Sequence, residues 1–341
     1  MRKLKPATIK DVALAAGVSV GSVSNVINGS RSVKAGTVKR VKAAMEKLGY
    51  RPSAAAQSMR TRSTRAVGFV VNDISNPIYA SIAKEAERLL NEQGYHLILV
   101  DSDNRPGQEV EIFNTLNSGR VDALVATLSD EQDPNIIRAL KNVDVPVVLL
   151  DREVDFPLDS ICIDYAKGLE KAVNYLTDLG HEDIALICGG ENIRPGRECI
   201  KGYRAALKKK EISFQQARVK AGPLTADFGY QQAMELLSRP ERPTALICGG
   251  NRIFAGALRA IKFLGLKMPD NLSVIAFDDT ELTALSSPEI TVIARDTKEI
   301  GAAVGQFIIR ALEGEKDAGF QNVILSAELL VRESCANVKR K

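Results

Sequence analysis

The sequence predicts two fold classes in one chain of 341 residues, a small all-α head followed by a larger α/β body. Two short amphipathic helices follow each other near the N-terminus, within residues 8–28. From Ala66 onward, apolar runs of strand length alternate with amphipathic stretches of helix length. This alternation is typical of doubly wound parallel sheets with helices on both faces, and the length of the body suits two such sheets.

The first predicted helix begins after Thr8 and ends at Gly17. Thr8 and Asp11 have the spacing of a capping box, which supplies partners for the free backbone N–H groups at a helix start. Glycine is common just after the last helical residue because it adopts positive φ without strain. The apolar side chains of this stretch share one face: Ile9, Val12, Ala13 and Ala16.

A second helix is predicted after a three-residue turn, with Ser19 as its N-cap and Val23, Val26 and Ile27 on its inner face. Its outward face carries side chains that are small or form hydrogen bonds, and none is acidic: Val20, Gly21, Ser22, Ser24, Asn25 and Asn28. Two helices joined in this way form a helix-turn-helix, whose second helix can enter the major groove of DNA. An ordinary helical hairpin is the alternative interpretation.

The charge distribution favours the DNA-binding interpretation. Residues 1–65 hold 14 lysines and arginines against Asp11 and Glu46 only, a net charge of +12. The remaining 32 basic and 40 acidic residues give −8, so the modest overall charge of +4 conceals a strongly basic head. A basic head of this kind is the electrostatic signature of phosphate contact. We therefore expect the head to bind duplex DNA.

A third helix completes the predicted head, with Val38, Val41, Met45 and Leu48 inward and Gly49 as its stop. The stretch 50–65 is then a linker in which Ser53 can cap a short alanine-rich helix. A helix of that length is too short to be stable alone. It would form only when something else stabilises it, which suits a sensor element.

The body contains eight apolar runs that we predict as strands, at 66–71, 96–100, 123–128, 146–151, 183–188, 244–248, 272–277 and 290–294. Amphipathic stretches between them predict helices over 77–93, 108–118, 166–179, 197–210, 229–238 and 252–264. No apolar run reaches the length needed to cross a bilayer, and no secretory leader precedes the head, so we expect a cytoplasmic protein.

The cysteines and histidines do not predict a metal centre. The five cysteines form no CxxC pair, and only two histidines are present: Cys162, Cys188, Cys199, Cys248, Cys335, His96 and His181. We expect reduced thiols and no metal.

The residues that carry chemistry lie at the ends of the predicted strands, where ligands bind in open parallel sheets. They are carboxylates and amides: Asn72, Asp73, Asp101, Asp151, Asp164, Asn251, Asp278 and Asp279. No glycine-rich phosphate motif follows any strand, which argues against a nucleotide cofactor. The adjacent acids Asp278 and Asp279 have no accompanying nucleophile and base. We therefore predict a binding cleft without a cofactor, and not an enzyme.

With these parts in this order, the chain resembles the LacI/GalR family of bacterial transcriptional regulators over about 7–334. The matching segments include IKDVALAAGVSVGSVSNVING, LGYRPSAAAQSMRTRSTRAVGFVV, NDISNPIYASI, LGHEDIALICGG, GALRAIKFLGLKMPDNLSVIAFDD and SPEITVIARDTKEIG. The resemblance implies a DNA-binding homodimer whose body has the two-lobed fold of periplasmic sugar-binding proteins. It also implies a small effector, usually a sugar or nucleobase, that shifts the lobes and decides whether the linker helices form.

The resemblance assigns DNA contacts to the head and the linker. Val20, Gly21 and Asn25 match base-reading positions, and Met59 matches a hinge residue that wedges into the minor groove. Lys34 stands where the family usually has a capping serine and would contact phosphate instead. The other DNA-binding residues that we assign are Thr8, Ser19, Ser22, Ser24, Asn28, Thr37, Ala56 and Gln57.

The resemblance also assigns the effector-facing positions in the cleft: Ile78, Tyr79, Asp151, Asp164, Arg197, Cys199, Leu224, Asn251, Asp278 and Arg295. Three positions depart from the family. Cys199 replaces a common effector-binding arginine, Arg252 follows Asn251 where an aspartate is usual, and Tyr165 follows Asp164 where an asparagine is usual. Cys199 as a redox sensor is an alternative that we consider weaker.

The arginines leave the charge of the effector open. Arg252 with Arg197 and Arg295 nearby would suit an anionic sugar derivative. In the alternative, Arg252 points to solvent or pairs with Asp278 or Asp279, and the effector is a neutral sugar.

The predicted domains are a helix-turn-helix domain over 1–49, a hinge over 50–65 and a two-lobed effector-binding and dimerisation domain over 66–338. One lobe comprises about 66–164 and 296–324, the other about 165–295 and 325–338. The predicted function is regulation, most simply repression, at a palindromic operator in the nucleoid. A sugar-binding protein without a regulatory role is the alternative, but it would not need the basic head.

Overall fold

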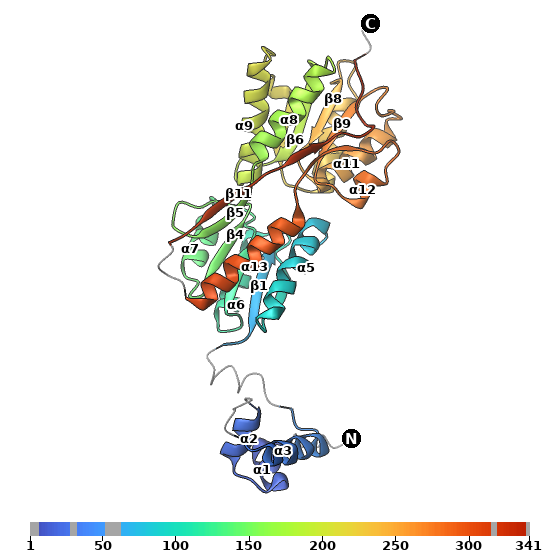
Figure 1. The fold of residues 1–341 in the computed structure, drawn as a ribbon. Helices are drawn as coiled ribbons and strands as arrows, with labels where there is room; N and C mark the ends of the chain where they lie inside the picture. Colours follow the sequence, from blue (N-terminus) through green and yellow to red (C-terminus); the bar gives the residue numbers. More distant parts are fainter. Residues whose placement is uncertain (1–6, 28–32, 52–62, 315–318, 339–341) are drawn as a thin grey trace. The chain divides into compact units, whose positions relative to one another are not determined.

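The computed structural model describes residues 7–27, 33–51, 63–314 and 319–338. The chain divides into two compact units, Met1–Thr64 and Arg65–Lys341. We call the first unit the head and the second the body, and both are drawn in Figure 1.

The head is built from three helices, α1 (Ile9–Ala16), α2 (Val20–Ile27) and α3 (Ala35–Leu48). The predicted capping box is present, because Thr8 accepts from the backbone of Asp11 while the Asp11 carboxylate accepts from the Thr8 N–H at 2.8 Å. Gly17 ends α1 at φ 62°, a conformation that most side chains avoid. Ser19 caps α2, since its hydroxyl accepts from the N–H of Ser22 at 3.1 Å.

The core of the head joins all three helices through Val12, Val23 and Val41, each fully buried. Leu48 does not join them as we expected, because it is 37% exposed at the last residue of α3, where Gly49 turns the chain away. The helices are short, so their stability depends on this small shared core.

The first sheet of the body is wholly parallel in the order β11-β5-β4-β3-β1-β2. Its strands are β1 (Ala66–Val71), β2 (His96–Asp101), β3 (Ala123–Ala126), β4 (Val147–Leu150), β5 (Asp159–Ile163) and β11 (Asn322–Leu325). Its helices are α5 (Pro77–Glu92), α6 (Pro106–Asn117), α7 (Pro134–Lys141) and α13 (Thr297–Glu313). We call this half lobe 1.

The second sheet has the order β12-β10-β9-β8-β6-β7, and only β12 is antiparallel. Its strands are β6 (Ile184–Gly189), β7 (Val219–Gly222), β8 (Ala245–Cys248), β9 (Ser273–Phe277), β10 (Thr291–Ala294) and β12 (Glu328–Leu330). Its helices are α8 (Tyr165–Asp178), α9 (Arg194–Lys209), α10 (Ala226–Leu237), α11 (Asn251–Phe263) and the short α12 (Glu281–Ala284). We call this half lobe 2.

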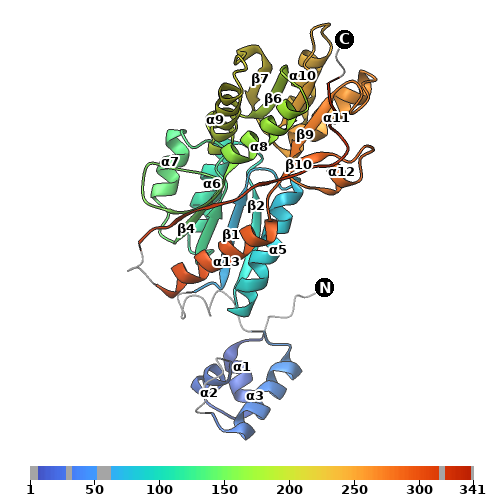
Figure 2. The same cartoon turned by 45° about the horizontal axis from the view of Figure 1, so that its top comes forward.

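The chain passes between the lobes three times, after β5, after β10 and after β11. Figures 1 and 2 show the two sheets stacked end to end, with α13 lying beside α5 on one face of lobe 1. Gly301 permits that close approach, since a Cβ there would lie 2.6 Å from the carbonyl oxygen of Ile82.

The strands β3, β4, β5, β6, β8 and β9 are buried along their whole length, as expected for parallel sheets covered on both faces. Among the described residues, no helix is long and apolar enough to cross a membrane.

Candidate functional site

The outward face of α2 is largely exposed. Ser19, Val20, Gly21 and Asn25 are exposed, and Ser22 and Ser24 are half-buried. The hydroxyl groups of Ser19 and Ser22 are 2.9 Å apart and hydrogen-bond to each other. A helix of small and amide side chains without acidic groups can approach base edges closely.

Two further predicted DNA contacts lie at the start of α3. Lys34 is its N-cap, is exposed and forms no capping hydrogen bond with its side chain. Thr37 is half-buried one turn further on. Thr8 is exposed, but its hydroxyl donates to the Asp11 carboxylate at 2.7 Å. The predicted contacts Asn28, Ala56, Gln57 and Met59 lie outside the described residues.

In the body, the carboxyl ends of strands from both lobes meet at a small cavity of about 40 Å³. Its lining residues are Asn76, Tyr79, Asp151, Arg152, Tyr165, Pro195, Leu224, Gly249, Gly250, Asn251, Arg252, Phe277, Asp278 and Arg295. We call this the cleft. A volume of that size holds only a few waters, so a sugar enters only if the lobes move apart or the side chains rearrange.

Arg295 is the electrostatic centre of the cleft. Its Nε lies 2.7 Å from Asp278 Oδ1 of lobe 2, and its Nη1 lies 2.5 Å from Asp151 Oδ2 of lobe 1. Burial opposes the charge of Arg295, but Asp278, Tyr165 and Asp151 together hold its pKa well above the ordinary arginine value. Arg295 therefore remains charged and joins the two lobes.

Tyr165 completes this group from the start of α8. Its hydroxyl donates to Asp151 Oδ2 at 2.9 Å and accepts from Arg295 Nη1 at 3.0 Å. Burial raises the pKa of Tyr165 well above its ordinary value, so the hydroxyl stays protonated. The ring stacks on Phe277 with 4.6 Å between centroids, which forms an apolar wall beside the polar groups.

A second set of contacts crosses between the lobes at the start of α11. Asn251 Nδ2 donates to Asp278 Oδ2 and to Asn76 Oδ1, both at 2.9 Å. Arg252 Nε lies 3.2 Å from Asp73 Oδ2 of lobe 1. The expectation that Arg252 points to solvent or pairs with Asp278 or Asp279 is wrong. Both carboxylates are already paired, Asp278 with Arg295 and Asp279 with Arg332.

Arg152 follows Asp151 at the end of β4, and the sequence analysis did not single it out. It is 1% exposed and donates through Nε to the carbonyl of Leu128 and through Nη1 to the carbonyl of Asp151. Its Nη2 has no hydrogen-bond partner among the described residues. A buried guanidinium donor without a partner is energetically costly, which marks it as a group that a ligand can satisfy.

Six predicted effector residues line the cleft: Tyr79, Asp151, Leu224, Asn251, Asp278 and Arg295. The other four do not line it. Asp164 caps α8 by accepting from the N–H of Lys167 at 2.9 Å, and Arg197 pairs with Glu131. Ile78 is 3% exposed and borders a neighbouring hollow.

Cys199 is fully buried in the core of the body, and burial raises the pKa of its thiol well above the ordinary value. An inaccessible protonated thiol reacts slowly with oxidants, which disfavours the redox alternative. Among the described residues, no group of histidines, cysteines and acids could hold a metal ion.

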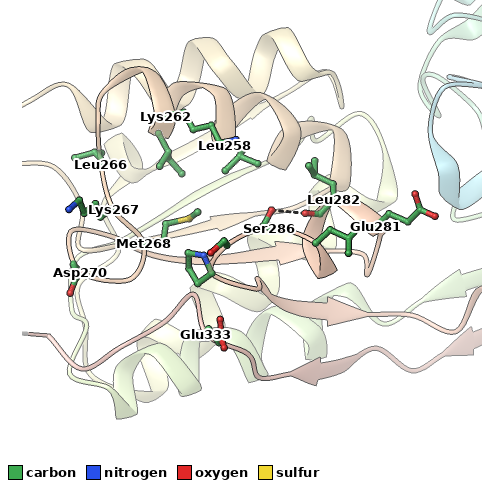
Figure 3. Close-up of a pocket in the computed structure, with 14 residues that line it drawn as sticks. Leu258, Lys262, Leu266, Lys267, Met268, Asp270, Glu281, Leu282, Ser286 and Glu333 are labelled. Carbon is green, nitrogen blue, oxygen red and sulfur yellow. Dashed lines mark hydrogen bonds between the residues drawn. The ribbon is translucent and has the colours of Figure 1, made fainter.

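Figure 3 shows a larger hollow elsewhere on lobe 2, bordered by Leu258, Leu266, Met268 and Leu282. Leu282 and its neighbour Leu285 are 42% and 81% exposed. Polar side chains such as Lys262, Asp270 and Glu281 also border it. The cleft is the better effector site because it lies at the carboxyl ends of the strands, where ligands bind in open parallel sheets.

Two family profiles match the chain. The profile described as "Bacterial regulatory proteins, lacI family" covers residues 8–53, and that of "Periplasmic binding proteins and sugar binding domain of LacI family" covers 64–333. The chain is 30% identical over 330 residues to the transcriptional regulator DegA of Bacillus subtilis, covering 96% of this chain and 97% of DegA. It is 33% identical over 296 residues to the ribose operon repressor of Escherichia coli K12, covering 86% and 90%.

Solved structures of transcriptional regulators resemble the whole chain. The lac repressor dimer bound to operator and an anti-inducer matches with a TM-score of 0.83 at 27% identity, covering 97% of this chain and all of that one. The regulator CelR in complex with cellobiose matches with a TM-score of 0.73 at 28% identity, covering 96% and 99%. These relatives are regulators of transcription and not enzymes. The chain is a DNA-binding transcriptional regulator and belongs to the LacI family of bacterial regulatory proteins.

Proposed function

We propose that this chain acts as a homodimeric repressor that binds a palindromic operator and responds to a sugar-like effector in the cleft. The observation that carries the proposal is the position of Arg295, which joins Asp151 of lobe 1 to Asp278 of lobe 2. Hydroxyl groups of a sugar both donate and accept hydrogen bonds. A sugar could therefore replace these bonds one for one while changing the distance between the lobes.

On the DNA side, we propose that Asn25 pairs with adenine in the major groove and that Val20 and Gly21 contact neighbouring bases. Phosphate contacts would come from Thr8, Ser19, Ser22, Ser24, Asn28, Lys34 and Thr37, and minor-groove contacts from Ala56, Gln57 and Met59. The domains would be 1–49, 50–65 and 66–338, and the protein would work at the nucleoid in the cytoplasm.

We propose a second copy of the chain as the partner for the exposed apolar side chains of the body. Leu285 is 81% exposed, Leu282 42% and Ile98 42%. The lac repressor among the similar structures is a dimer. Burying such side chains against a second copy supplies hydrophobic stabilisation and aligns two heads with the two halves of a palindrome.

We propose a neutral sugar as the effector, with Asp151, Asn251, Asp278 and Arg295 as its polar contacts. The charge pairing supports this, since Arg197, Arg252 and Arg295 each lie within 4.0 Å of a carboxylate. An anionic sugar derivative is the second candidate, and the unpartnered Nη2 of Arg152 favours it.

A thermal-shift panel of neutral sugars, sugar acids and sugar phosphates separates the two candidates. A ligand that binds only the folded protein raises its Tm by mass action. We expect a neutral sugar to raise the Tm and Asp278→Asn to abolish that rise. Stabilisation by sugar acids alone, lost in Arg152→Gln, would assign the second candidate. If no sugar or derivative raised the Tm, the proposed effector class would be wrong.

A further inference from the structure

Glu131 connects the two lobes at a position that is separate from the cleft. It lies in the loop between β3 and α7 of lobe 1, and its side chain is 2% exposed. From lobe 2, its Oε1 accepts from the backbone N–H of Arg194 at 2.8 Å, and its Oε2 lies 2.5 Å from Arg197 Nη2. From lobe 1, it accepts from the N–H of Glu153 at 3.2 Å.

The backbone extends the same contact. The N–H of Glu131 donates to the carbonyl of Asn192 at 3.1 Å. Both the backbone and the side chain of Glu131 therefore bond to the segment around the start of α9. Arg194 is the first residue of α9, where free N–H groups and the helix dipole favour a negative charge. A buried carboxylate with three donors from two lobes is well satisfied in the closed arrangement and loses two of them when the lobes separate.

Arg194 also donates from Nη1 to the carbonyl of Ile163 of lobe 1 at 2.9 Å, beside the Glu131 contact. The contacts between the lobes around the cleft differ from these. Arg295 and Asn251 line the cleft, so an effector there would compete for their partners. Arg252 contacts Asp73 at 3.2 Å, but its Nε forms no directed hydrogen bond. Neither Glu131 nor Arg197 lines the cleft, so their bonds do not have to break when an effector occupies it.

We propose that Glu131 is a positioning residue that holds the two lobes closed before any effector binds. This proposal takes one point from the proposed function, namely that the effector binds in the cleft. We call the contacts of Glu131 with Asn192, Arg194 and Arg197 the clasp. Because the clasp stabilises only the closed arrangement, it raises the closed fraction of the free protein. The closed cavity of about 40 Å³ is too small for a sugar, so the clasp lowers the fraction of free protein that can admit an effector, and the apparent affinity falls with that fraction.

The test measures the distance between the lobes without an effector. Spin labels are attached at Asn114→Cys on α6 and Lys208→Cys on α9, both exposed. The background carries Cys335→Ser, because Cys335 is the half-exposed native thiol among five. The full chain is used, diluted with unlabelled protein to exclude distances between copies. Pulsed dipolar spectroscopy then reports the distance distribution.

We expect one short distance in the wild type and a second, longer population in Glu131→Gln. The ratio of open to closed molecules should rise by about tenfold or more, as for loss of a hydrogen bond to a charged group. The matched control is Glu153→Gln. Its carboxylate is 69% exposed and 3.9 Å from Arg194 Nε, so its removal should leave the distribution unchanged.

Arg197→Gln keeps the two backbone donors to Glu131 and removes the ion pair, so an intermediate open population is expected. If Glu131→Gln does not fold, the Arg197→Gln variant tests the proposal in its place. A folded Glu131→Gln or Arg197→Gln variant with the wild-type distribution would overturn the proposal. The measurement needs neither an effector nor DNA, so failure of the clasp and failure of the proposed function are separately visible.

Discussion

Arg295 shows how one side chain can hold two lobes together. Its side chain is 7% exposed, as is that of Asp151, and Asp278 is 3% exposed. Removing such ions from water is costly, and their attraction offsets the cost only while the geometry is intact. The group is therefore stable as a whole and sensitive to the loss of any member.

We predict that Arg295→Met destabilises the body by about 3–5 kcal/mol, because it leaves two buried carboxylates without their cation. Urea unfolding of the body, followed by circular dichroism, measures this. Arg252→Met is the matched control, because the Arg252–Asp73 pair is partly exposed at 34% and 24%. Its loss should cost about 1 kcal/mol or less. Equal effects of the two variants would contradict this view of the cleft.

His181 makes the stability of the body depend on pH. It is 3% exposed and its ring nitrogens contact Thr244, Ser273 and the carbonyl of Ala336. Burial lowers its pKa below the ordinary value of 6.5. As the pH falls below about 6.5, His181 binds a proton more readily in the unfolded chain than in the folded body. The free energy of unfolding therefore decreases as the pH drops through this range.

The measurement is the Tm of the body from about pH 7.5 to about pH 5.5. We predict a decrease in the wild type and a flatter profile in His181→Gln. The chain has only one other histidine, His96, which is exposed and serves as the control. If His96→Gln flattened the profile and His181→Gln did not, this account of the pH dependence would fail.

At the scale of elements, the helix caps of the head are unequal. The N-terminus of α1 has a complete capping box, whereas Lys34 gives α3 no capping hydrogen bond. A lysine at this position leaves α3 without a side-chain cap but adds a positive charge to the head.

We predict that Lys34→Ser stabilises the head by about 0.5–1 kcal/mol and reduces the magnitude of the salt slope of DNA binding by about one. Hydrogen exchange of the α3 amides and duplex titrations at several salt concentrations measure the two effects. The control is Lys47→Ser in the last turn of α3, which provides no N-cap and should not stabilise the helix. A weaker α3 in Lys34→Ser would contradict the capping argument.

The sequence predicted most strands of both sheets and six of the body helices, but it did not single out the amphipathic helices α7 and α13. Continuous apolar runs identified five of the six strands that are buried along their whole length. The sixth, β5, begins with the polar residues Asp159 and Ser160 and was not among the predicted runs. Helices α6 and α9 start two or three residues earlier than predicted, with Pro106 and Pro195 in their first turns, where proline fits and an apolar pattern has not begun. Strand β11 was missed because its burial alternates, which leaves no apolar run in a short segment.

The sequence predicted six of the residues that line the cleft but not the ion pairs that cross between the lobes. Parallel topology places the strand-end residues of each sheet at one edge, Asp151 in lobe 1 and Asp278 in lobe 2. Which charges pair across the lobes depends on how closely two separately folded sheets approach. Arg252 with Asp73 and Arg197 with Glu131 therefore could not be predicted from local pattern. Arg152 could have been found, since it directly follows a predicted cleft aspartate.

For the whole molecule, the separation of charge matches the separation of roles. The first 65 residues carry +12 and the remainder −8. A basic head on an acidic body binds phosphates while the body does not compete for the same DNA. The binding of each head to DNA should therefore weaken steeply as salt displaces its phosphate contacts.

The central claim is that two basic heads recognise a two-fold symmetric operator. Selection from a random duplex library with the full chain, followed by titration of the recovered sequence at several salt concentrations, tests it most directly. We predict a palindrome with half-sites about one helical turn apart, bound by two chains with a steep loss of affinity in salt. Recovery of no symmetric sequence, or equal affinity for a scrambled duplex, would contradict the account.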